Sequence, residues 1–216
     1  MTQQAQLSAI LDKFHQTTPK PVQSVINKTR NDFIASFDPK KAIHVGDHLP
    51  EFRLTDAVGT QRESGELLTH GPLLITFYRG EWCPFCNIAL VGFQKIMDDI
   101  KANGVTFVAI SPQLPNESLS TAEKHDLQFP VLSDVGNEYA RQLGILFHQP
   151  DSLRPIFEKF GHSLPERNGD DSMIVPVPAT ILVDKDGIVK NLFLDPDYTK
   201  RVEPATVLEW ISALKH

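Results

Sequence analysis

The chain has little cysteine, no excess of basic charge and no long hydrophobic run. It has two cysteines in 216 residues, too few for the disulfide-stabilised domains of small secreted proteins. Acidic residues outnumber Lys and Arg by 27 to 21, and no basic patch indicates a nucleic-acid partner. No apolar run approaches the ~20 residues that cross a bilayer, and residues 1–6 lack the pattern of a signal peptide. We therefore expect a cytoplasmic protein with no nucleic-acid partner and no membrane partner.

The remaining composition is that of a globular protein, with 41% hydrophobic and 22% charged residues. Apolar residues recur at helical spacing in residues 1–43, and the segment 18–21 divides this region into two helices. Their polar faces are not rich in Lys and Arg, so we expect packing on the main domain or a partner subunit rather than on a membrane surface. The predicted organisation is a helical extension, 1–43, followed by one domain, 44–216.

Strands alternate with helices through most of the second region, which predicts an α/β fold with a mixed central sheet covered by helices on both faces. The continuous apolar run 73–77 is typical of a central strand that is buried on both faces. Turn residues 184–187 between two apolar segments indicate a hairpin. The predicted strands are 52–55, 73–77, 105–110, 131–132, 179–183 and 188–194, and the predicted helices are 84–101, 116–126, 138–143, 151–160 and 203–214.

Both cysteines lie in the segment Trp82-Cys83-Pro84-Phe85-Cys86, between a predicted strand and a predicted helix. A C-x-x-C pair in this setting is typical of thioredoxin-like redox proteins. Pro84 suits the first position of a helix, which makes Cys83 the N-cap or its neighbour. The helix dipole and the free N–H groups of the first turn favour a thiolate there. Cys83 is thus predicted as the attacking thiolate, with Cys86 as the buried resolving thiol.

Neighbouring residues suggest how such a dithiol could work without a metal or an organic cofactor. Arg79 could supply a positive charge near the sulfurs, and Trp82 and Phe85 could form an apolar rim for a partner or a hydroperoxide. A zinc site needs four ligands, and the chain has no second C-x-x-C pair. His44 and His48 lie in a predicted loop with Gly and Asp between them, so we expect no metal.

A second marker precedes the predicted strand 179–183, where Val177 and Pro178 lead into it. A proline that enters a strand suits a tight turn and can adopt the cis form. In thioredoxin-fold proteins a proline at this place lies against the dithiol, so Val177 and Pro178 are predicted to border the substrate pocket.

Several segments together carry a family resemblance from about residue 45 to the C-terminus. They are Val45-Gly46-Asp47 with Leu49-Pro50, Phe77-Tyr78-Arg79-Gly80-Glu81-Trp82-Cys83-Pro84-Phe85-Cys86, Ser133-Asp134, Asn137-Glu138-Tyr139-Ala140, Leu164-Pro165 with Asn168-Gly169-Asp170, Val177-Pro178-Ala179-Thr180, and Asp195-Pro196-Asp197-Tyr198-Thr199 with Arg201 and Glu203-Pro204. In this order they resemble the peroxiredoxin-like branch of the AhpC/TSA family, which has the thioredoxin fold. The resemblance implies a thiol peroxidase that reduces hydrogen peroxide or organic hydroperoxides and is regenerated by thioredoxin or a similar dithiol.

The motif departs from that of ordinary peroxiredoxins, which have the pattern P-x-x-x-T-x-x-C after Phe-Tyr. In this register Arg79 takes the place of the proline, Cys83 that of the threonine and Cys86 that of the peroxidatic cysteine. The peroxidase comparison therefore assigns Cys86 as the attacking thiolate and Cys83 as the resolving thiol, opposite to the thioredoxin comparison. On grounds of exposure and helix capping, the sequence favours Cys83.

The sequence is also compatible with two functions besides a peroxidase. The second is a thiol–disulfide oxidoreductase with little peroxidase activity, and the third is an interaction protein that only keeps the fold. Asp195, Tyr198 and Arg201 could border the active site, link subunits or form a structural loop. The insertion 148–171 could cover the dithiol or form a contact in a homodimer.

Overall fold

The structure, a computed structural model, describes residues 1–214. The last two residues of the predicted 44–216 domain lie outside this range. Within it, no helix combines the length and the apolar character needed to cross a membrane.

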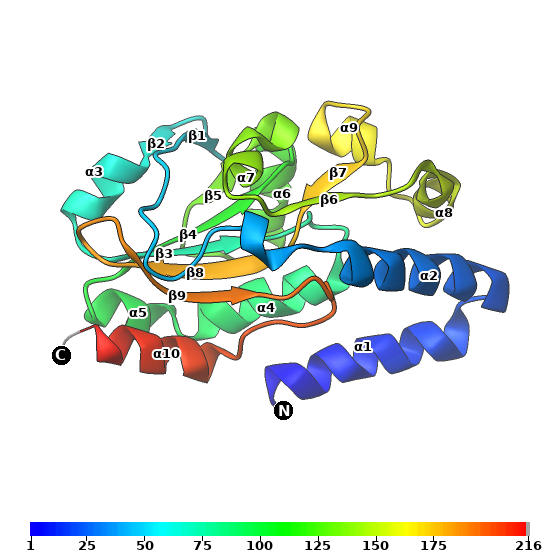
Figure 1. Cartoon of the computed structure of the whole chain (residues 1–216), viewed down its shortest axis with the longest axis horizontal. Helices are drawn as coiled ribbons and strands as arrows, with labels where there is room; N and C mark the ends of the chain where they lie inside the picture. Colours follow the sequence, from blue (N-terminus) through cyan, green and yellow to red (C-terminus); the bar gives the residue numbers. More distant parts are fainter. Residues whose placement is uncertain (215–216) are drawn as a thin grey trace.

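The core of the fold is a seven-stranded sheet with the strand order β2-β1-β5-β4-β3-β8-β9 (Figure 1). Strand β3 lies near its centre, pairs in parallel with β4 and antiparallel with β8, and is buried at all five positions. The predicted mixed sheet is therefore confirmed. The strands are β1 Arg53–Asp56, β2 Gln61–Glu63, β3 Leu73–Phe77, β4 Thr106–Ser111, β5 Val131–Ser133, β8 Ala179–Val183 and β9 Val189–Leu194, and a separate pair consists of β6 Leu146–His148 and β7 Ile174–Pro176.

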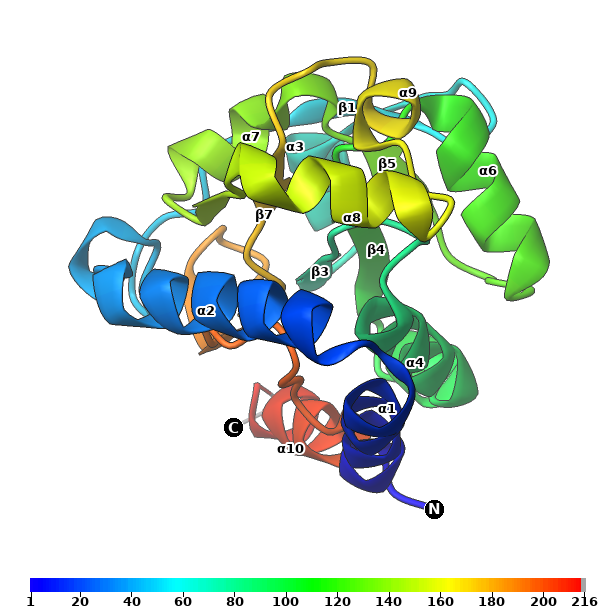
Figure 2. The ribbon, with the colours of Figure 1, turned by 90° about the vertical axis from the view of Figure 1, so that its right-hand side faces the viewer.

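Helices cover both faces of the sheet, as predicted. Figures 1 and 2 show α4, α5 and α10 on one face and α6 and α7 on the other. Each face of a central strand is apolar and must be covered, so this layering follows from the buried runs of β3 and β4. The helices are α1 Gln3–Thr17, α2 Lys20–Ser36, α3 Ser64–Thr69, α4 Pro84–Lys95, α5 Met97–Ala102, α6 Pro115–Lys124, α7 Glu138–Gln142, α8 Arg154–Lys159, α9 Leu164–Asn168 and α10 Pro204–Ala213.

The prediction of one uninterrupted helix over 84–101 was wrong. The helix breaks at Ile96, whose φ of −108° and ψ of 13° lie outside the helical region, and α5 starts at the next residue. The Ile96 N–H instead bonds the carbonyl of Phe93, 3.1 Å away, in a tighter turn. Phe93, Met97 and Ile100 are all buried across this break. The apolar pattern continues through the bend because both segments pack on the same sheet, so periodicity alone does not show it.

The N-terminal extension packs on the main body of the same chain. The side chain of Gln3 in α1 is buried and donates a hydrogen bond of 2.6 Å to the carbonyl of Val202. Phe33 in α2 stacks on Phe147, with ring centroids 4.1 Å apart. Figure 2 shows α1 beside α4 and α10, with α2 above it. The extension is thus part of one packed structure, and the boundary at residue 43 stays a prediction.

Gly144 offers a test of how tightly the end of the extension lies on the domain. Its φ is +68°, and an added Cβ would lie 2.0 Å from the carbonyl oxygen of Lys41. We expect Gly144→Ala to lower the free energy of unfolding by about 3 kcal/mol, from left-handed strain plus a backbone clash. Gly136→Ala is the matched control, because φ there is +80° but no atom lies within 4 Å. Urea denaturation of the reduced protein should show a loss of only about 1 kcal/mol for the control, and equal losses would contradict the clash.

Candidate active site

The two cysteines lie at the junction of β3 and α4, near the centre of the fold. Cys83 is the N-cap of α4 and Pro84 its first residue, as the sequence predicts. The backbone N–H of Cys86 donates to the carbonyl of Cys83 over 3.0 Å, which fixes the first turn. Both cysteines are free thiols, with only 1% and 0% of Cys83 and Cys86 exposed. Exposure therefore does not distinguish the two sulfurs, although the sequence-based preference for Cys83 relied partly on it.

Arg201 contacts the second sulfur directly. Its Nη2 lies 2.9 Å from Sγ of Cys86 and donates a hydrogen bond to it. Its Nη1 donates to the backbone carbonyls of Tyr198 and Lys200, each at 2.6 Å, so the guanidinium is held in place. Arg201 lies in the loop that joins β9 to α10 (Figure 1). Of the roles left open for this residue, the structure places it at the dithiol.

The surroundings of the two sulfurs shift their pKa values in opposite directions. Burial raises the pKa of Cys86, but a hydrogen bond from Cys83, the charge of Arg201 and the backbone N–H and charge of Arg79 together lower it below its usual value. Burial, the hydrogen bond with Cys86 and its negative charge raise the pKa of Cys83. These surroundings favour the negative charge of the pair on Cys86 and the proton on Cys83.

Arg79 is buried beside the dithiol within a set of aromatic rings. Its guanidinium carbon lies 4.1 Å from the ring centroid of Tyr198 and 4.6 Å from that of Trp82. Its Nη2 donates to Oε1 of Gln149 over 2.7 Å. The rings and the amide hold this buried cation in place, and a buried charge is screened less by solvent than one on the surface, so it acts strongly on nearby sulfurs.

A cavity of about 270 Å³ opens in front of Cys83, and Trp82 and Phe85 line it together with Arg79. Val177 and Pro178, which were predicted to border the site, are not among its lining residues. The N–H of Val177 donates to the carbonyl of Ile145, so this segment is held towards the end of α7. Residues 1–214 contain no cis peptide bond, so Pro178 is trans.

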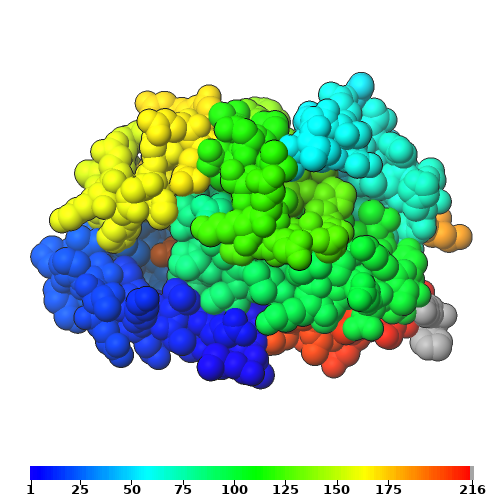
Figure 3. All heavy atoms as spheres, turned by 180° about the vertical axis from the view of Figure 1, so that it is seen from behind, coloured from blue at the N-terminus to red at the C-terminus, as the bar shows by residue number. Residues whose placement is uncertain are grey.

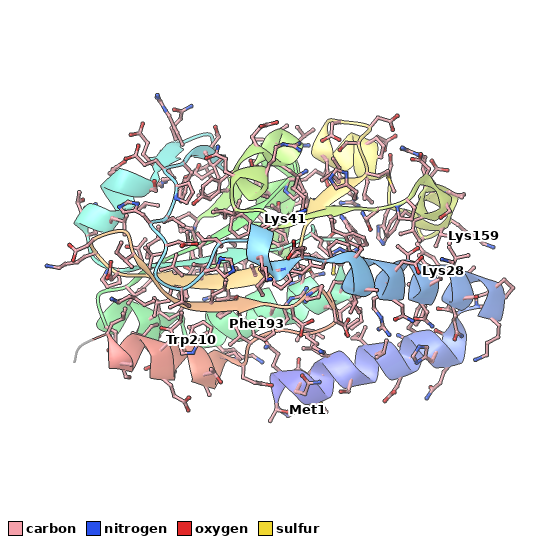
Figure 4. The ribbon with its side chains drawn as sticks, in the orientation of Figure 1. Met1, Lys28, Lys41, Lys159, Phe193 and Trp210 are labelled. Atoms are coloured by element: carbon pink, nitrogen blue, oxygen red, sulfur yellow. The ribbon has the colours of Figure 1, made fainter. Side chains whose placement is uncertain are left out.

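The insertion 148–171 forms one side of this cavity. Phe157 in α8 meets Trp82 edge to face, with centroids 5.0 Å apart, and Gln149 and Leu153 also line the cavity. Figure 4 shows α2, which carries Lys28, and α8, which carries Lys159, at the same end of the molecule. Of the two roles considered for the insertion, the structure shows a cover over the dithiol. The described residues include no group of three or more His, Cys, Asp or Glu placed to hold a metal ion.

Comparisons with known proteins agree with this geometry. A profile of the AhpC/TSA family matches residues 45–192. Peroxiredoxin Bcp of Escherichia coli is 32% identical over 108 residues, 50% of this chain and 67% of that protein. The thiol-disulfide oxidoreductase ResA of Bacillus cereus is 23% identical over 154 residues, 71% of each chain.

Among solved structures, the peroxidoxin BcpB of Mycobacterium tuberculosis superposes with a TM-score of 0.63 at 21% identity, over 81% of this chain and 99% of that one. This likeness shows the fold, and it confirms the predicted thioredoxin-like architecture. The part of the chain that the family profile leaves unmatched at the N-terminus comprises α1 and α2.

Proposed function

The chain belongs to the AhpC/TSA family and is a peroxiredoxin-type thiol peroxidase, and on this premise we propose that Cys86 attacks the hydroperoxide and Cys83 resolves the product. The observation that carries this assignment is the 2.9 Å hydrogen bond from Arg201 to Sγ of Cys86. The lowered pKa of Cys86 supports it, because the thiolate is the nucleophilic form. The register of the peroxiredoxin motif gives the same answer. The proposed order is opposite to the sequence-based preference for Cys83.

In the first step, the Cys86 thiolate attacks one peroxide oxygen and the O–O bond breaks. Cys86 becomes a sulfenic acid. The leaving oxygen takes a proton, which the Cys83 thiol beside Cys86 can donate. Cys83, now a thiolate, then attacks the Cys86 sulfur and a disulfide forms. The S–O bond breaks, and the hydroxide that leaves takes a proton from the solvent to become water. The sum is one hydroperoxide and two thiols converted into one alcohol, one water and one disulfide, the alcohol being a second water when the substrate is hydrogen peroxide. We assign Arg79 and Arg201 to stabilise the thiolate and the leaving oxygen by charge.

The disulfide must be reduced by an external thiol before the next turnover. We propose a thioredoxin-like dithiol, because exchange through a mixed disulfide reduces a C-x-x-C pair without any further cofactor. A reducing compartment such as the cytoplasm suits this cycle. A homodimer stays a prediction.

The second candidate function is a thiol–disulfide oxidoreductase, which the likeness to ResA and the W-C-P-x-C motif favour. In that mechanism the first cysteine of the motif is the attacking thiolate. Here Cys83 has a raised pKa and holds the proton, which argues against this role.

A single-turnover measurement separates the two functions without knowledge of the reductant. We expect the reduced protein, mixed with hydrogen peroxide or an organic hydroperoxide in stopped flow, to lose thiols about 10³-fold or more faster than free cysteine, well within the range of enzymatic acceleration. Insulin reduction by the same preparation should be slow. Thiol loss no faster than that of free cysteine, together with rapid insulin reduction, would favour the oxidoreductase.

A further inference from the structure

The cavity in front of Cys83 has walls that the family resemblance does not explain. Helices α1 and α2 contribute a large share of its lining, and both precede residue 45, where the family match starts. The opposite side comes from the insertion around α8. Figure 3 shows the corresponding hollow in the surface between the blue N-terminal helices and the yellow segment.

Most of the side chains in the walls are apolar, and about a third are polar, including Asn27, Thr29 and Arg30 from α2. Ile10, Leu11 and Phe14 come from α1, Ile26 from α2 and Phe157 from α8. The buried Cys83 and Arg79 lie in the same cavity. An apolar pocket with a few polar groups is the usual form of a binding site for a small organic molecule.

The cavity is much larger than hydrogen peroxide requires. Its volume of about 270 Å³ equals the volume that about nine water molecules occupy in liquid water. An apolar molecule that covers these side chains removes their surface from water, which favours its binding. Apolar cavities also hold apolar molecules better than water.

We propose that this cavity binds the organic tail of the substrate, so that the N-terminal helices direct the enzyme towards hydroperoxides with a bulky apolar group. The proposal rests on the proposed function, since it places the hydroperoxide group at the dithiol. Burial of the tail against α1 and α2 holds the O–O bond beside Cys83, the cysteine that lines the cavity, about one helical turn from Cys86. Positioning of this kind accelerates reaction. Hydrogen peroxide has no such tail and gains nothing from these walls.

The test fills the cavity from the α2 wall. In Ile26→Trp we expect the ratio of kcat/KM for cumene hydroperoxide to that for hydrogen peroxide to fall about tenfold or more, the effect of a poor fit in an apolar pocket. Ile34→Trp is the matched control, because Ile34 lies on the same helix, is 37% exposed and does not line the cavity. Its ratio should equal that of the unaltered protein. If Ile26→Trp does not fold, Leu11→Phe makes a smaller change on the α1 wall.

Binding of cumyl alcohol, the unreactive product, measured by calorimetry separates this proposal from the proposed function. Loss of cumyl alcohol binding in Ile26→Trp but not in Ile34→Trp would support the pocket. Slow reaction with every hydroperoxide would overturn the peroxidase and leave this evidence for the pocket intact. Unchanged ratios and unchanged binding in Ile26→Trp would overturn the pocket while leaving the peroxidase intact.

Discussion

Replacement of Cys86 by Ser is expected to lower the rate of hydroperoxide reduction by about 10⁴-fold or more, because the nucleophile itself is lost. Cys83→Ser is expected to keep the first step within about tenfold, since the serine hydroxyl also donates a hydrogen bond to the Cys86 thiolate and solvent water can supply the proton that the leaving oxygen takes. Turnover stops in both variants, because neither can form the disulfide. Stopped-flow mixing with one equivalent of hydrogen peroxide measures the first step.

Mass spectrometry of the same samples identifies the oxidised sulfur. Cys83→Ser should accumulate sulfenic acid on Cys86, and the double variant sets the background. A rapid reaction in Cys86→Ser, with sulfenic acid on Cys83, would restore the thioredoxin-like assignment and overturn ours.

Local patterns in the sequence are sufficient to predict the strands, turns and helix start that form the scaffold of the site. The apolar run 73–77 indicates the central strand, and Pro84 marks the start of α4. Gly187 closes the turn between β8 and β9 with a φ of +81°. These features depend on neighbours within a few residues, so a single sequence contains them. The three-residue strands β2, β6 and β7 are missed because so short a segment has no measurable period, and the equally short β5 was predicted only as the apolar pair 131–132.

The contacts that decide the chemistry come from far along the chain. Arg201 lies 115 residues after Cys86 in sequence, yet donates to its sulfur. Arg201 belongs to one of the segments that carry the family resemblance, which was the signal in the sequence. That signal does not show which group Arg201 contacts. The packing of α1 and α2 over the dithiol is likewise set by tertiary contacts, such as Phe33 on Phe147, that no local pattern predicts.

The choice between the cysteines shows why the local argument was insufficient. A helix N-terminus stabilises a negative charge by about 0.3–1 kcal/mol at exposed sites and by up to about 2 kcal/mol at partly buried ones. A hydrogen bond that involves a charged group contributes about 1.5–3 kcal/mol. The dipole at the start of α4 acts on both Cys83 and Cys86, whereas the Arg201 hydrogen bond reaches Cys86. The direct contact therefore outweighs the preference that capping gives to Cys83.

Arg201→Gln is expected to slow hydroperoxide reduction near neutral pH by about 10²–10³-fold, the usual effect of removing one donor from a developing anion. Without this cation the pKa of Cys86 rises, so less thiolate is present at neutral pH. In the unaltered protein, whose Cys86 pKa is already lowered, the rate should be nearly constant as pH rises from neutral. In the variant it should continue to rise with pH, so the deficit shrinks in alkaline solution. Stopped-flow rates across the pH range measure both profiles.

Arg201→Lys is the matched variant, because it keeps the positive charge but loses the planar group that bonds the sulfur and two backbone carbonyls together. We expect it to restore part of the rate and to move the midpoint of the pH profile back towards that of the unaltered protein. A residue that only anchored the loop before α10 would behave differently, since its loss would lower the rate equally at every pH. A uniform deficit in Arg201→Gln, with no change in the midpoint, would therefore remove Arg201 from the activation of Cys86.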